Sequence, residues 1–570
     1  MAVIFERDLV CTLRDGTPLA ANVFRPDTTD RVPVLLVRIP YGKDGIINYT
    51  YANPLLLAEA GYIVAVQDVR GTFGSGGTFG DMSQEIQDGW DAVEWASKLP
   101  GSNGVVGMYG ASYYAWTQLA AAGTGHPALK TIVPTIPHIS GDNSRGGAVE
   151  WGLFASWLLS MLPAQLMRTA QANPEFPLQF AKAVHIIDHM RELVYPELPI
   201  SRFSAIREFG VFSDYLRPLD ARTSASPPAL QAAAAPRDMQ VSALVIGGWY
   251  DLFLGNALSL FRQFREAGRH VKLLIGPWTH TSGPVNYVGE VDFGLAASGM
   301  AIDLRHSITD IHRQWFDSQL KGQPEGANEP TVRIFTMGEN RWRTAPDWPV
   351  PDAAPTAFYL VSSGRANTAG GDGRLTRERS LRERTDHFVY DPANPVPTVG
   401  GNTLMAPSLP AGPFDQLDVE RRDDVLVYTS DPLETPLRVT GDITARLFVA
   451  SDAPDTDFVV RLTDVHPDGR SINIVDGITR MRHRPGAAAG ETMTGGAVYE
   501  VTVDCWATSH VFLPGHRLRV HVTSSCFPRW NRNLNTGGSN EHDAEFRSAH
   551  QALLHGPEHP SHILLPVATG

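Results

Sequence analysis

The sequence predicts three parts: an α/β domain, a helical insertion within it, and a C-terminal all-β domain. Apolar strand-like runs alternate with helical segments over residues 1–139 and again over 236–347, the pattern of a parallel, doubly wound sheet. Residues 140–235 contain helical segments and no convincing strand. Over residues 348–570, short strand-like segments and turns replace helical periodicity, which indicates a β-sandwich of the jelly-roll type.

Length and composition agree with a multidomain globular protein. A chain of 570 residues is too long for one hydrophobic core. The formal net charge of −13 argues against a nucleic-acid partner, because phosphate contacts need clustered Lys and Arg. The three cysteines, Cys11, Cys505 and Cys526, suggest neither a disulfide framework nor a zinc-binding spacing. We therefore expect no metal and no cofactor.

The sequence carries no targeting or membrane signal. Residues 1–8 lack the basic segment and the long apolar run of a signal peptide. No apolar stretch approaches the roughly 20 residues of a membrane span. We expect a cytoplasmic protein with no membrane partner, and the sequence leaves a homodimer open.

In chain order, the first α/β segment begins with a hairpin. Asp15-Gly16 is a turn signal between two strand-like runs. The apolar runs that follow are continuous, which is typical of central parallel strands buried on both faces. Up to residue 139 we expect strands at 10–13, 19–24, 32–37, 62–68, 105–109 and 131–134, and helices at 53–60 and 85–99.

The insertion and the second α/β segment follow. The apolar helical stretch 151–159 could fold over a site as a cap, or serve only as a satellite of the core. After the insertion we expect strands at 243–251 and 271–280 and helices at 257–267 and 302–320. In the β domain, turns such as Pro467-Asp468-Gly469 and Pro514-Gly515 separate the strand-like segments.

A candidate nucleophile lies where the apolar run 105–109 meets the next helix. Gly110-Ala111-Ser112 forms a tight turn of small residues there. A serine at the apex of a strand–turn–helix unit is the nucleophile elbow of an α/β-hydrolase. Gly110 stands two residues before the serine, where a Cβ would strike the neighbouring backbone. Tyr114 occupies the position of the usual second glycine, so an ordinary glycine-bounded turn fits this stretch equally well.

Two further strand ends supply the partners that such a serine requires. Asp251 ends the strand 243–251 and His280 ends the strand 271–280. Functional groups of open α/β sheets gather at the carboxyl ends of strands, and the order Ser, Asp, His is that of α/β-hydrolases. Asp251 could instead cap a helix, and His280 is one of nineteen histidines. Their ordered occurrence favours a catalytic triad of Ser112, Asp251 and His280.

Seven stretches together carry a family resemblance. They are Arg38-Ile39-Pro40-Tyr41, Gln67-Asp68-Val69-Arg70-Gly71, Gly110-Ala111-Ser112-Tyr113, Gly248-Trp249-Tyr250-Asp251, Gly276-Pro277-Trp278-Thr279-His280, Thr508 to His516 and Asn533 to Gly538. They resemble the CocE/NonD serine hydrolases, the cocaine-esterase-like relatives of X-prolyl dipeptidyl peptidases in peptidase family S15. The resemblance spans essentially the whole chain and implies an α/β-hydrolase domain with a helical cap insertion and a C-terminal jelly-roll domain. The family usually has G-x-S-Y-x-G, and here Ala115 replaces the last glycine, a small change on the helix side.

The resemblance also implies an oxyanion hole and an acyl pocket. In this family a tyrosine hydroxyl from the first strand–helix loop joins a backbone N–H just after the serine. Here these donors would be Tyr41 and the amide of Tyr113, which would stabilise developing negative charge. Tyr41 could otherwise be a core tyrosine. The implied substrate-binding residues are Trp157, Phe253, Leu404 and Met405.

The sequence therefore predicts a serine esterase that acts on a small-molecule ester through an acyl-enzyme intermediate. Two alternatives stay open: a peptidase or acylase on amides, such as X-Pro dipeptides or β-lactam side chains, and a binding protein on an inactive hydrolase fold. Relatives that act on α-amino acid esters place acids just after the triad aspartate, where this chain has Leu252-Phe253-Leu254. We expect esters of uncharged, apolar acids, unless Asp142 or Glu150 reaches the site.

Overall fold

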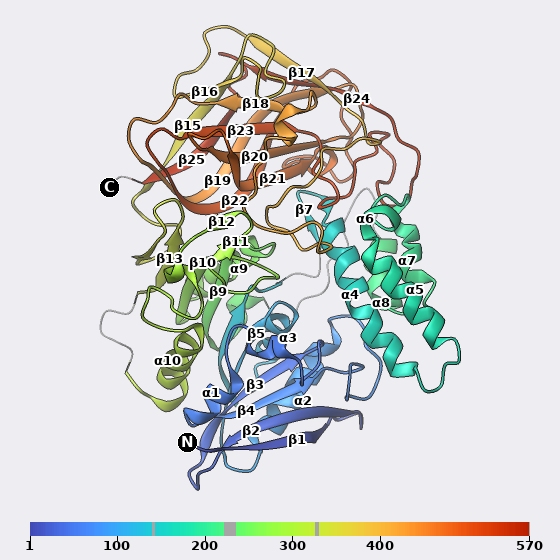
Figure 1. Ribbon diagram of the computed structural model, residues 1–570, viewed down its shortest axis with the longest axis vertical. Coiled ribbons are helices and arrows are strands. Elements are labelled where there is room, and N and C mark those ends of the chain that lie inside the picture. Colours follow the sequence, from blue (N-terminus) through green and yellow to red (C-terminus); the bar gives the residue numbers. More distant parts are fainter. Residues whose placement is uncertain (140–142, 222–234, 325–329, 569–570) are drawn as a thin grey trace.

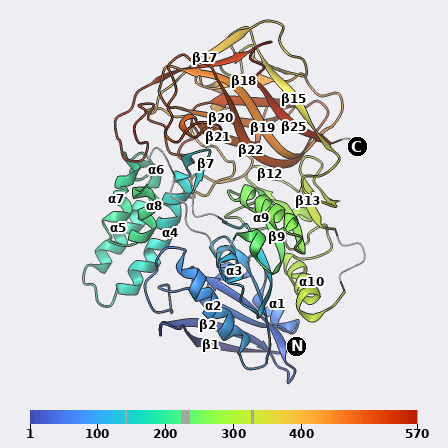
Figure 2. The ribbon, with the colours of Figure 1, turned by 180° about the vertical axis from the view of Figure 1, so that it is seen from behind.

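A computed structural model of the chain describes residues 1–139, 143–221, 235–324 and 330–568. An α/β part that contains the N-terminus lies at one end and an all-β part at the other (Figure 1). A group of helices lies beside both, as the view from behind also shows (Figure 2). The predicted fold class, an α/β-hydrolase domain with a helical cap insertion and a C-terminal all-β domain, is confirmed.

The α/β part is built on a ten-stranded sheet in the order β1-β2-β4-β3-β5-β6-β9-β10-β13-β14. Its strands are β1 (Val3–Thr12), β2 (Pro18–Pro26), β3 (Val32–Ile39), β4 (Ile63–Asp68), β5 (Ser102–Ala111), β6 (Leu129–Thr135), β9 (Ser242–Tyr250), β10 (Val271–Thr279), β13 (Val332–Thr336) and β14 (Arg341–Ala345). The seven central strands are mutually parallel: β4, β3, β5, β6, β9, β10 and β13. The strands β1, β2 and β14 pair antiparallel at the two edges. The continuous apolar runs are thus the buried central strands.

Helices cover both faces of this sheet. They are α1 (Pro54–Glu59), α2 (Gln84–Ser97), α3 (Tyr113–Gly123), α9 (Leu254–Glu266) and α10 (Ile308–Lys321). Apolar side chains of α2, α3 and α9 share one core with the sheet, and those of α1 and α10 share another. The helix predicted from residue 302 begins only at Ile308, because Ser307 and Asp310 form a capping box there. A small hairpin, β11 (Tyr287–Val288) and β12 (Val291–Asp292), precedes it.

The insertion is mainly helical. It contains α4 (Trp151–Thr169), α5 (Phe176–Asp188), α6 (Met190–Leu193), α7 (Ser204–Arg207) and α8 (Ser213–Asp220), preceded by an unpredicted hairpin of β7 (Ser144–Arg145) and β8 (Ala148–Val149). Its apolar core includes Phe79 and Tyr113 of the α/β part and Met405 of the β part, so the helices pack against both. Among the helices that the structure describes, none has the length and apolar character that crossing a bilayer would require.

The C-terminal part has eleven strands: β15 (Ala353–Val361), β16 (Arg374–Thr376), β17 (Arg384–Tyr390), β18 (Leu426–Thr429), β19 (Leu437–Ser451), β20 (Asp457–Val465), β21 (Ser471–Arg480), β22 (Tyr499–Phe512), β23 (Arg517–Thr523), β24 (Ala549–His555) and β25 (His562–Ala568). One run of strands, β18-β23-β20-β21, is joined to the others through the pairing of β16 with β18. Side chains of both groups, such as Leu447 and Val460, meet in one apolar core. The predicted turns at 467–469 and 514–515 connect β20 to β21 and β22 to β23.

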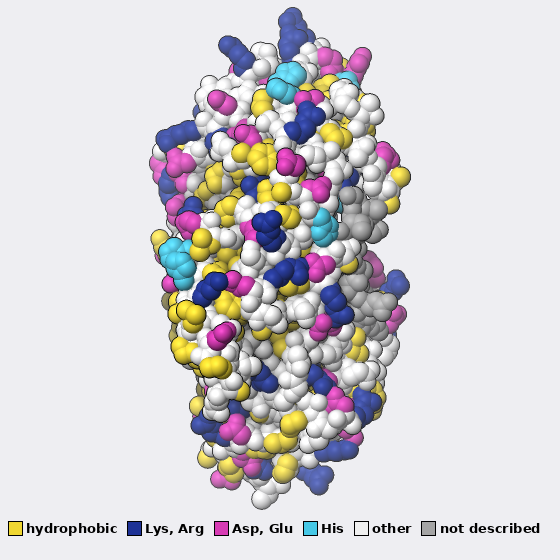
Figure 3. All heavy atoms as spheres, turned by 90° about the vertical axis from the view of Figure 1, so that its right-hand side faces the viewer, with side chains coloured by type: hydrophobic (Ala, Val, Ile, Leu, Met, Phe, Trp, Pro, Cys, Tyr) yellow, Lys and Arg dark blue, Asp and Glu magenta, His cyan; other side chains and the backbone are white. Residues whose placement is uncertain are grey.

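Short 3-10 helices complete the secondary structure. They are Ile46–Tyr49, Ile200–Arg202, Pro236–Asp238, Leu295–Ala297, Val419–Arg421 and Met481–His483. The face in Figure 3 shows Lys and Arg side chains interspersed with Asp and Glu. This face therefore carries no continuous basic patch.

A buried ion pair connects the central sheet to the turn that follows β5. Arg38 on β3 and Glu85 on α2 are both fully buried, with Nη1 and Oε2 2.7 Å apart. The hydroxyl of Tyr113, the residue after Ser112, donates to Glu85 Oε1 at 3.0 Å. The side chain of Arg38 also donates to Gln67 at 3.0 Å. The first residue of α3 is thus connected to β3 through charged side chains away from water.

We expect Glu85→Ala to lower the free energy of unfolding of the α/β part by about 3–5 kcal/mol, because it leaves the Arg38 charge buried and unpaired. The measurement is urea denaturation followed by tryptophan fluorescence. Gln87→Ala on the same helix is the control, since Gln87 is exposed, its side-chain oxygen accepts from the surface residue Arg14 at 2.8 Å, and this bond should contribute less than about 1 kcal/mol. A loss for Glu85→Ala no larger than that of the control would contradict the expectation.

Candidate active site

Ser112 stands at the apex of a sharp turn between β5 and α3. Its backbone has φ 59° and ψ −121°, a left-handed conformation that is strained for a residue with a side chain. At Gly110, whose φ is 139°, an added Cβ would lie 2.0 Å from Cδ2 of Tyr114. The close neighbour of Gly110 is therefore the Tyr114 ring and not the backbone that we expected. The Tyr114 ring lies where a side chain at position 110 would have to go, so position 110 requires glycine. The same tyrosine occupies position 114, where the usual motif has its second glycine.

A buried glutamine that the motif does not include fastens this turn. Gln118 on α3 donates through Nε2 to the carbonyls of Gly110 at 3.0 Å and Tyr114 at 2.8 Å. Its Oε1 accepts from the amide of Val133 on β6 at 3.0 Å. The amide of Ser112 donates to the carbonyl of Thr135 at 3.0 Å. Hydrogen bonds from α3 on one side and to β6 on the other thus hold the strained turn in place.

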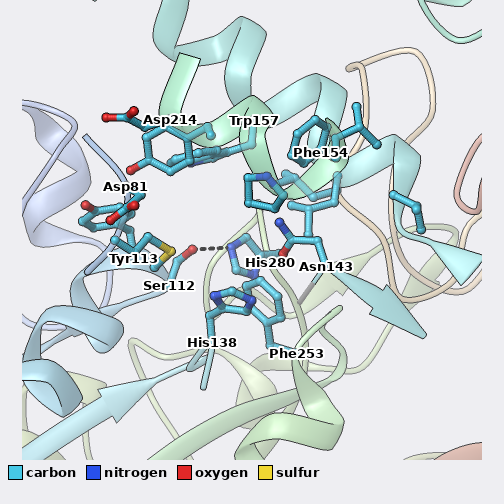
Figure 4. Close-up of a pocket in the computed structure, with 17 residues that line it drawn as sticks. Asp81, Ser112, Tyr113, His138, Asn143, Phe154, Trp157, Asp214, Phe253 and His280 are labelled. Atoms are coloured by element: carbon cyan, nitrogen blue, oxygen red, sulfur yellow. Dashed lines mark hydrogen bonds between the residues drawn. The ribbon is translucent and has the colours of Figure 1, made fainter. Parts of the chain in front are cut away.

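The three residues predicted as a triad lie in one hydrogen-bonded line at the carboxyl ends of β5, β9 and β10. His280 Nε2 is 2.8 Å from Ser112 Oγ, the contact drawn as a dashed line in Figure 4. His280 Nδ1 is 2.8 Å from Asp251 Oδ2. Asp251 is fully buried and the His280 side chain is 8% exposed, whereas Ser112 opens into the pocket. The arrangement lets an imidazole withdraw a proton from a hydroxyl that faces a cavity.

The loop that carries Asp251 is held by the β domain. Asp251 Oδ1 accepts from the amide of Phe253 at 2.7 Å, which leaves Oδ2 for His280. Asn402 donates through Nδ2 to the carbonyls of Trp249 at 2.7 Å and Asp251 at 3.0 Å. Asn402 is buried and was not predicted, because nothing in the sequence connects a loop of the β domain to a strand end 151 residues away.

Tyr41 lies beside the serine and is fixed by the cap. Trp157 Nε1 on α4 donates to the Tyr41 hydroxyl at 3.0 Å. That hydroxyl is in turn within hydrogen-bonding reach of Ser112. Burial raises the pKa of the Tyr41 phenol, although its bonds to Trp157 and Ser112 act in the opposite direction. Because its oxygen accepts from Trp157, its own O–H is left to donate toward the reaction centre.

The pocket in front of Ser112 is lined mainly by apolar side chains from all three parts. Its volume is about 100 Å³. Trp157, Phe253 and Leu404 line it, together with Leu153, Phe154, Val149, Tyr113, Tyr215, Met82, Pro218 and Leu219. Met405 is not part of this lining, because its side chain is packed against Gly152, where an added Cβ would lie 2.6 Å from Met405 Cγ. The predicted stretch at 404–405 thus contributes one residue to the pocket and one to the packing behind it.

Two carboxylates in the lining were not predicted. Asp81, before α2, and Asp214, on α8, both border the pocket (Figure 4). Arg217 lies 3.4 Å from Asp81 and 2.8 Å from Asp214, so one guanidinium faces both. Glu150 points elsewhere: it accepts from Trp530 at 2.9 Å and lies 3.6 Å from Arg529. Asp142 lies outside the described residues.

His138 is a further lining residue, and it follows β6 at the same edge of the sheet as the triad. Its ring lies 4.7 Å from that of Phe253. Burial, with a smaller effect of the nearby His280, lowers the pKa of His138 to about 4. At neutral pH it is therefore uncharged and adds no positive charge beside His280. Its position just after a central strand is a signal that could have identified it.

The sequence matches two family models. Residues 15–282 match the X-Pro dipeptidyl-peptidase (S15 family), and residues 325–564 match the X-Pro dipeptidyl-peptidase C-terminal non-catalytic domain. A cocaine esterase of Rhodococcus sp. (strain MB1 Bresler) is 37% identical over 98% of each chain. The chain belongs to the CocE/NonD family. The esterase relative and the matched hydrolase family show that the CocE/NonD protein is a carboxylic ester hydrolase of the serine esterase class.

Two solved structures share the fold over the whole length of this CocE/NonD protein. An aminopeptidase from the marine sediment archaeon Thaumarchaeota archaeon has a TM-score of 0.80 at 24% identity, covering 100% of this chain and 96% of that one. A CocE/NonD family hydrolase from Staphylococcus aureus has a TM-score of 0.67 at 18% identity, covering 100% and 94%. At these identities the likeness concerns the fold, and it extends through the cap and the β domain.

Proposed function

We propose that this CocE/NonD protein hydrolyses carboxylic esters of apolar acyl groups through an acyl-enzyme on Ser112. The observation that carries the proposal is the line of contacts from Ser112 through His280 to Asp251, with both distances at 2.8 Å. A hydroxyl becomes an effective nucleophile when an imidazole accepts its proton and a carboxylate stabilises the imidazolium. The contacts match these requirements, and Ser112 faces a pocket that can hold the acyl group.

The reaction proceeds in two stages. Ser112 Oγ attacks the ester carbonyl while His280 Nε2 takes its proton, and the Tyr41 hydroxyl and the Tyr113 amide stabilise the oxyanion. His280 then donates the proton to the leaving alcohol, which leaves the acyl group on Ser112. Water then attacks the acyl carbonyl while His280 removes a proton from it. When the second oxyanion collapses, the bond to Ser112 Oγ breaks, His280 returns the proton to this oxygen, and the acid is released.

The lining of the pocket favours a small, uncharged acyl group. The pocket volume of about 100 Å³ is smaller than the about 150 Å³ of an engineered apolar cavity that holds benzene, so it suits a short aliphatic acyl group, and an aromatic ring would extend toward the open side of the pocket. Trp157, Phe253 and Leu404 would gain from burying apolar area. An ammonium group among these three side chains would lose hydration. Asp81 and Asp214 border the pocket but share Arg217, so only one net negative charge remains there for an ammonium group.

Ser112→Ala should abolish labelling by a fluorophosphonate and lower kcat/KM for esters by about 10⁶-fold, because the nucleophile is lost while the fold is kept. Gel fluorescence and hydrolysis of p-nitrophenyl butyrate measure the two effects. Ser363→Ala, a change at an exposed serine of the β domain, should behave as wild type. Labelling or turnover of Ser112→Ala at the wild-type level would rule out Ser112 as the nucleophile. If wild type itself neither labels nor turns over esters, the inactive-fold alternative holds instead.

Tyr41→Phe should lower kcat by roughly 10²–10³-fold with little change in KM, because one oxyanion donor is removed. Trp157→Phe keeps an aromatic ring but removes the indole N–H that orients Tyr41, and we expect kcat to fall by about 3- to 10-fold. In the Tyr41→Phe background, Trp157→Phe should have no further effect on kcat. Independent, additive losses in steady-state kinetics of the double variant would contradict this coupling.

Methyl phenylacetate should be hydrolysed with a kcat/KM at least roughly tenfold above that of methyl phenylglycinate, which differs from it by a single ammonium group. The amide of phenylacetic acid should be slower still, because an amine leaving group requires protonation. Steady-state kinetics on this matched set provide the measurement. A preference of wild type for the glycinate would overturn the proposed substrate class. If the variant Asp214→Asn then lost this preference, the Asp214 carboxylate would be the group that binds the substrate ammonium.

A further inference from the structure

A second cluster of titratable side chains lies in the β domain, away from the residues that line the pocket. Asp464 lies near the end of β20, His466 follows that strand, and His516 immediately precedes β23. Each offers one ligating atom, and these atoms all lie within 4.8 Å of one another. Among the described residues, no other His, Cys, Asp and Glu side chains form a group that meets this criterion.

The contacts within the cluster centre on the carboxylate. Asp464 is nearly fully buried, and its Oδ1 lies 2.9 Å from His516 Nδ1. Its Oδ2 lies 3.8 Å from His466 Nε2, too far for a hydrogen bond. The His466 ring is 27% exposed and makes no hydrogen bond with any part of the chain that the structure describes. The cluster therefore contains one imidazole that faces a carboxylate across a gap.

These spacings suit a tetrahedral metal ion. With metal–ligand bonds of about 2.0–2.2 Å, neighbouring ligand atoms of a zinc site lie roughly 3.3–3.6 Å apart. The 2.9 Å from Oδ1 to His516 and the 3.8 Å from Oδ2 to His466 fall on either side of this range, and the three ligating atoms lie within 4.8 Å of one another, so small side-chain shifts would bring them to it. Two imidazoles and a carboxylate are a ligand set that Zn²⁺ accepts, with the fourth position left to water on the exposed side of His466.

The surroundings hold the ligands in place. His510 Nε2 lies 3.0 Å from Asp464 Oδ2, the kind of contact that orients a ligating carboxylate from behind. The two turns are also neighbours, since the ring centroids of His466 and His516 lie 4.5 Å apart.

We propose that Asp464, His466 and His516 form a binding site for a divalent transition-metal ion, with Zn²⁺ as the best chemical match. The ion would join the turn between β20 and β21 to the turn between β22 and β23. Its role is structural, because the three ligands belong to the β domain and none of them lines the pocket in front of Ser112.

The test uses the full chain after treatment with EDTA and dialysis. Titration with ZnCl₂ in a calorimeter, with the bound metal counted by mass spectrometry, should give one tight site per chain. His466→Ala should weaken that site at least tenfold, and Co²⁺ in place of Zn²⁺ should give visible d–d absorption that this variant lacks. Zn²⁺ should also raise the melting temperature of wild type more than that of His466→Ala.

His559→Ala is the matched control, because His559 is also 27% exposed and also lies beside a carboxylate, that of Glu383. It should bind Zn²⁺ like wild type. Both variants change partly exposed side chains and should leave ester hydrolysis unaltered. Equal Zn²⁺ affinity in wild type and His466→Ala, or no specific binding in wild type, would overturn the proposal and show that the cluster is a hydrogen-bonded network only.

Discussion

The left-handed backbone of Ser112 is the constraint on which the rest of the site depends. A serine at φ 59° costs about 1–3 kcal/mol in local strain, and such strain persists only when the surroundings enforce it. Here Gln118 joins the turn to β6 from one side, and the Tyr114 ring fills the space over Gly110 from the other. The result is a hydroxyl that projects from the end of the sheet toward His280.

The groups that complete the site around this hydroxyl come from separate parts of the chain. The α/β part supplies Asp251 and His280, the cap supplies Trp157, and the β domain supplies Asn402. Each contact is short and polar, and apolar side chains pack around it. Because electrostatic interactions are stronger away from water, the packing that lines the pocket also strengthens the contacts along the triad.

Much of this arrangement could be predicted from the sequence. The central strands are continuous apolar runs, and Ser112, Asp251 and His280 each follow one of them, so their convergence follows from the parallel topology. Other features depend on packing between distant segments. No local pattern predicts that Asn402 reaches Asp251, that Asp81 and Asp214 border the pocket, or that Met405 packs against Gly152 instead of facing the substrate. These contacts are set by how the cap and the β domain pack against the sheet.

Covalent chemistry at Ser112 is the central feature of the proposed mechanism. The most direct measurement is mass spectrometry of the protein quenched with acid during turnover of p-nitrophenyl benzoate, followed by peptide mapping. We predict that a fraction of the chains carries one benzoyl group, that the modified peptide contains Ser112, and that the adduct disappears once the substrate is exhausted. A benzoyl adduct on another residue, or turnover without any adduct when burst kinetics show that deacylation limits the rate, would contradict the account.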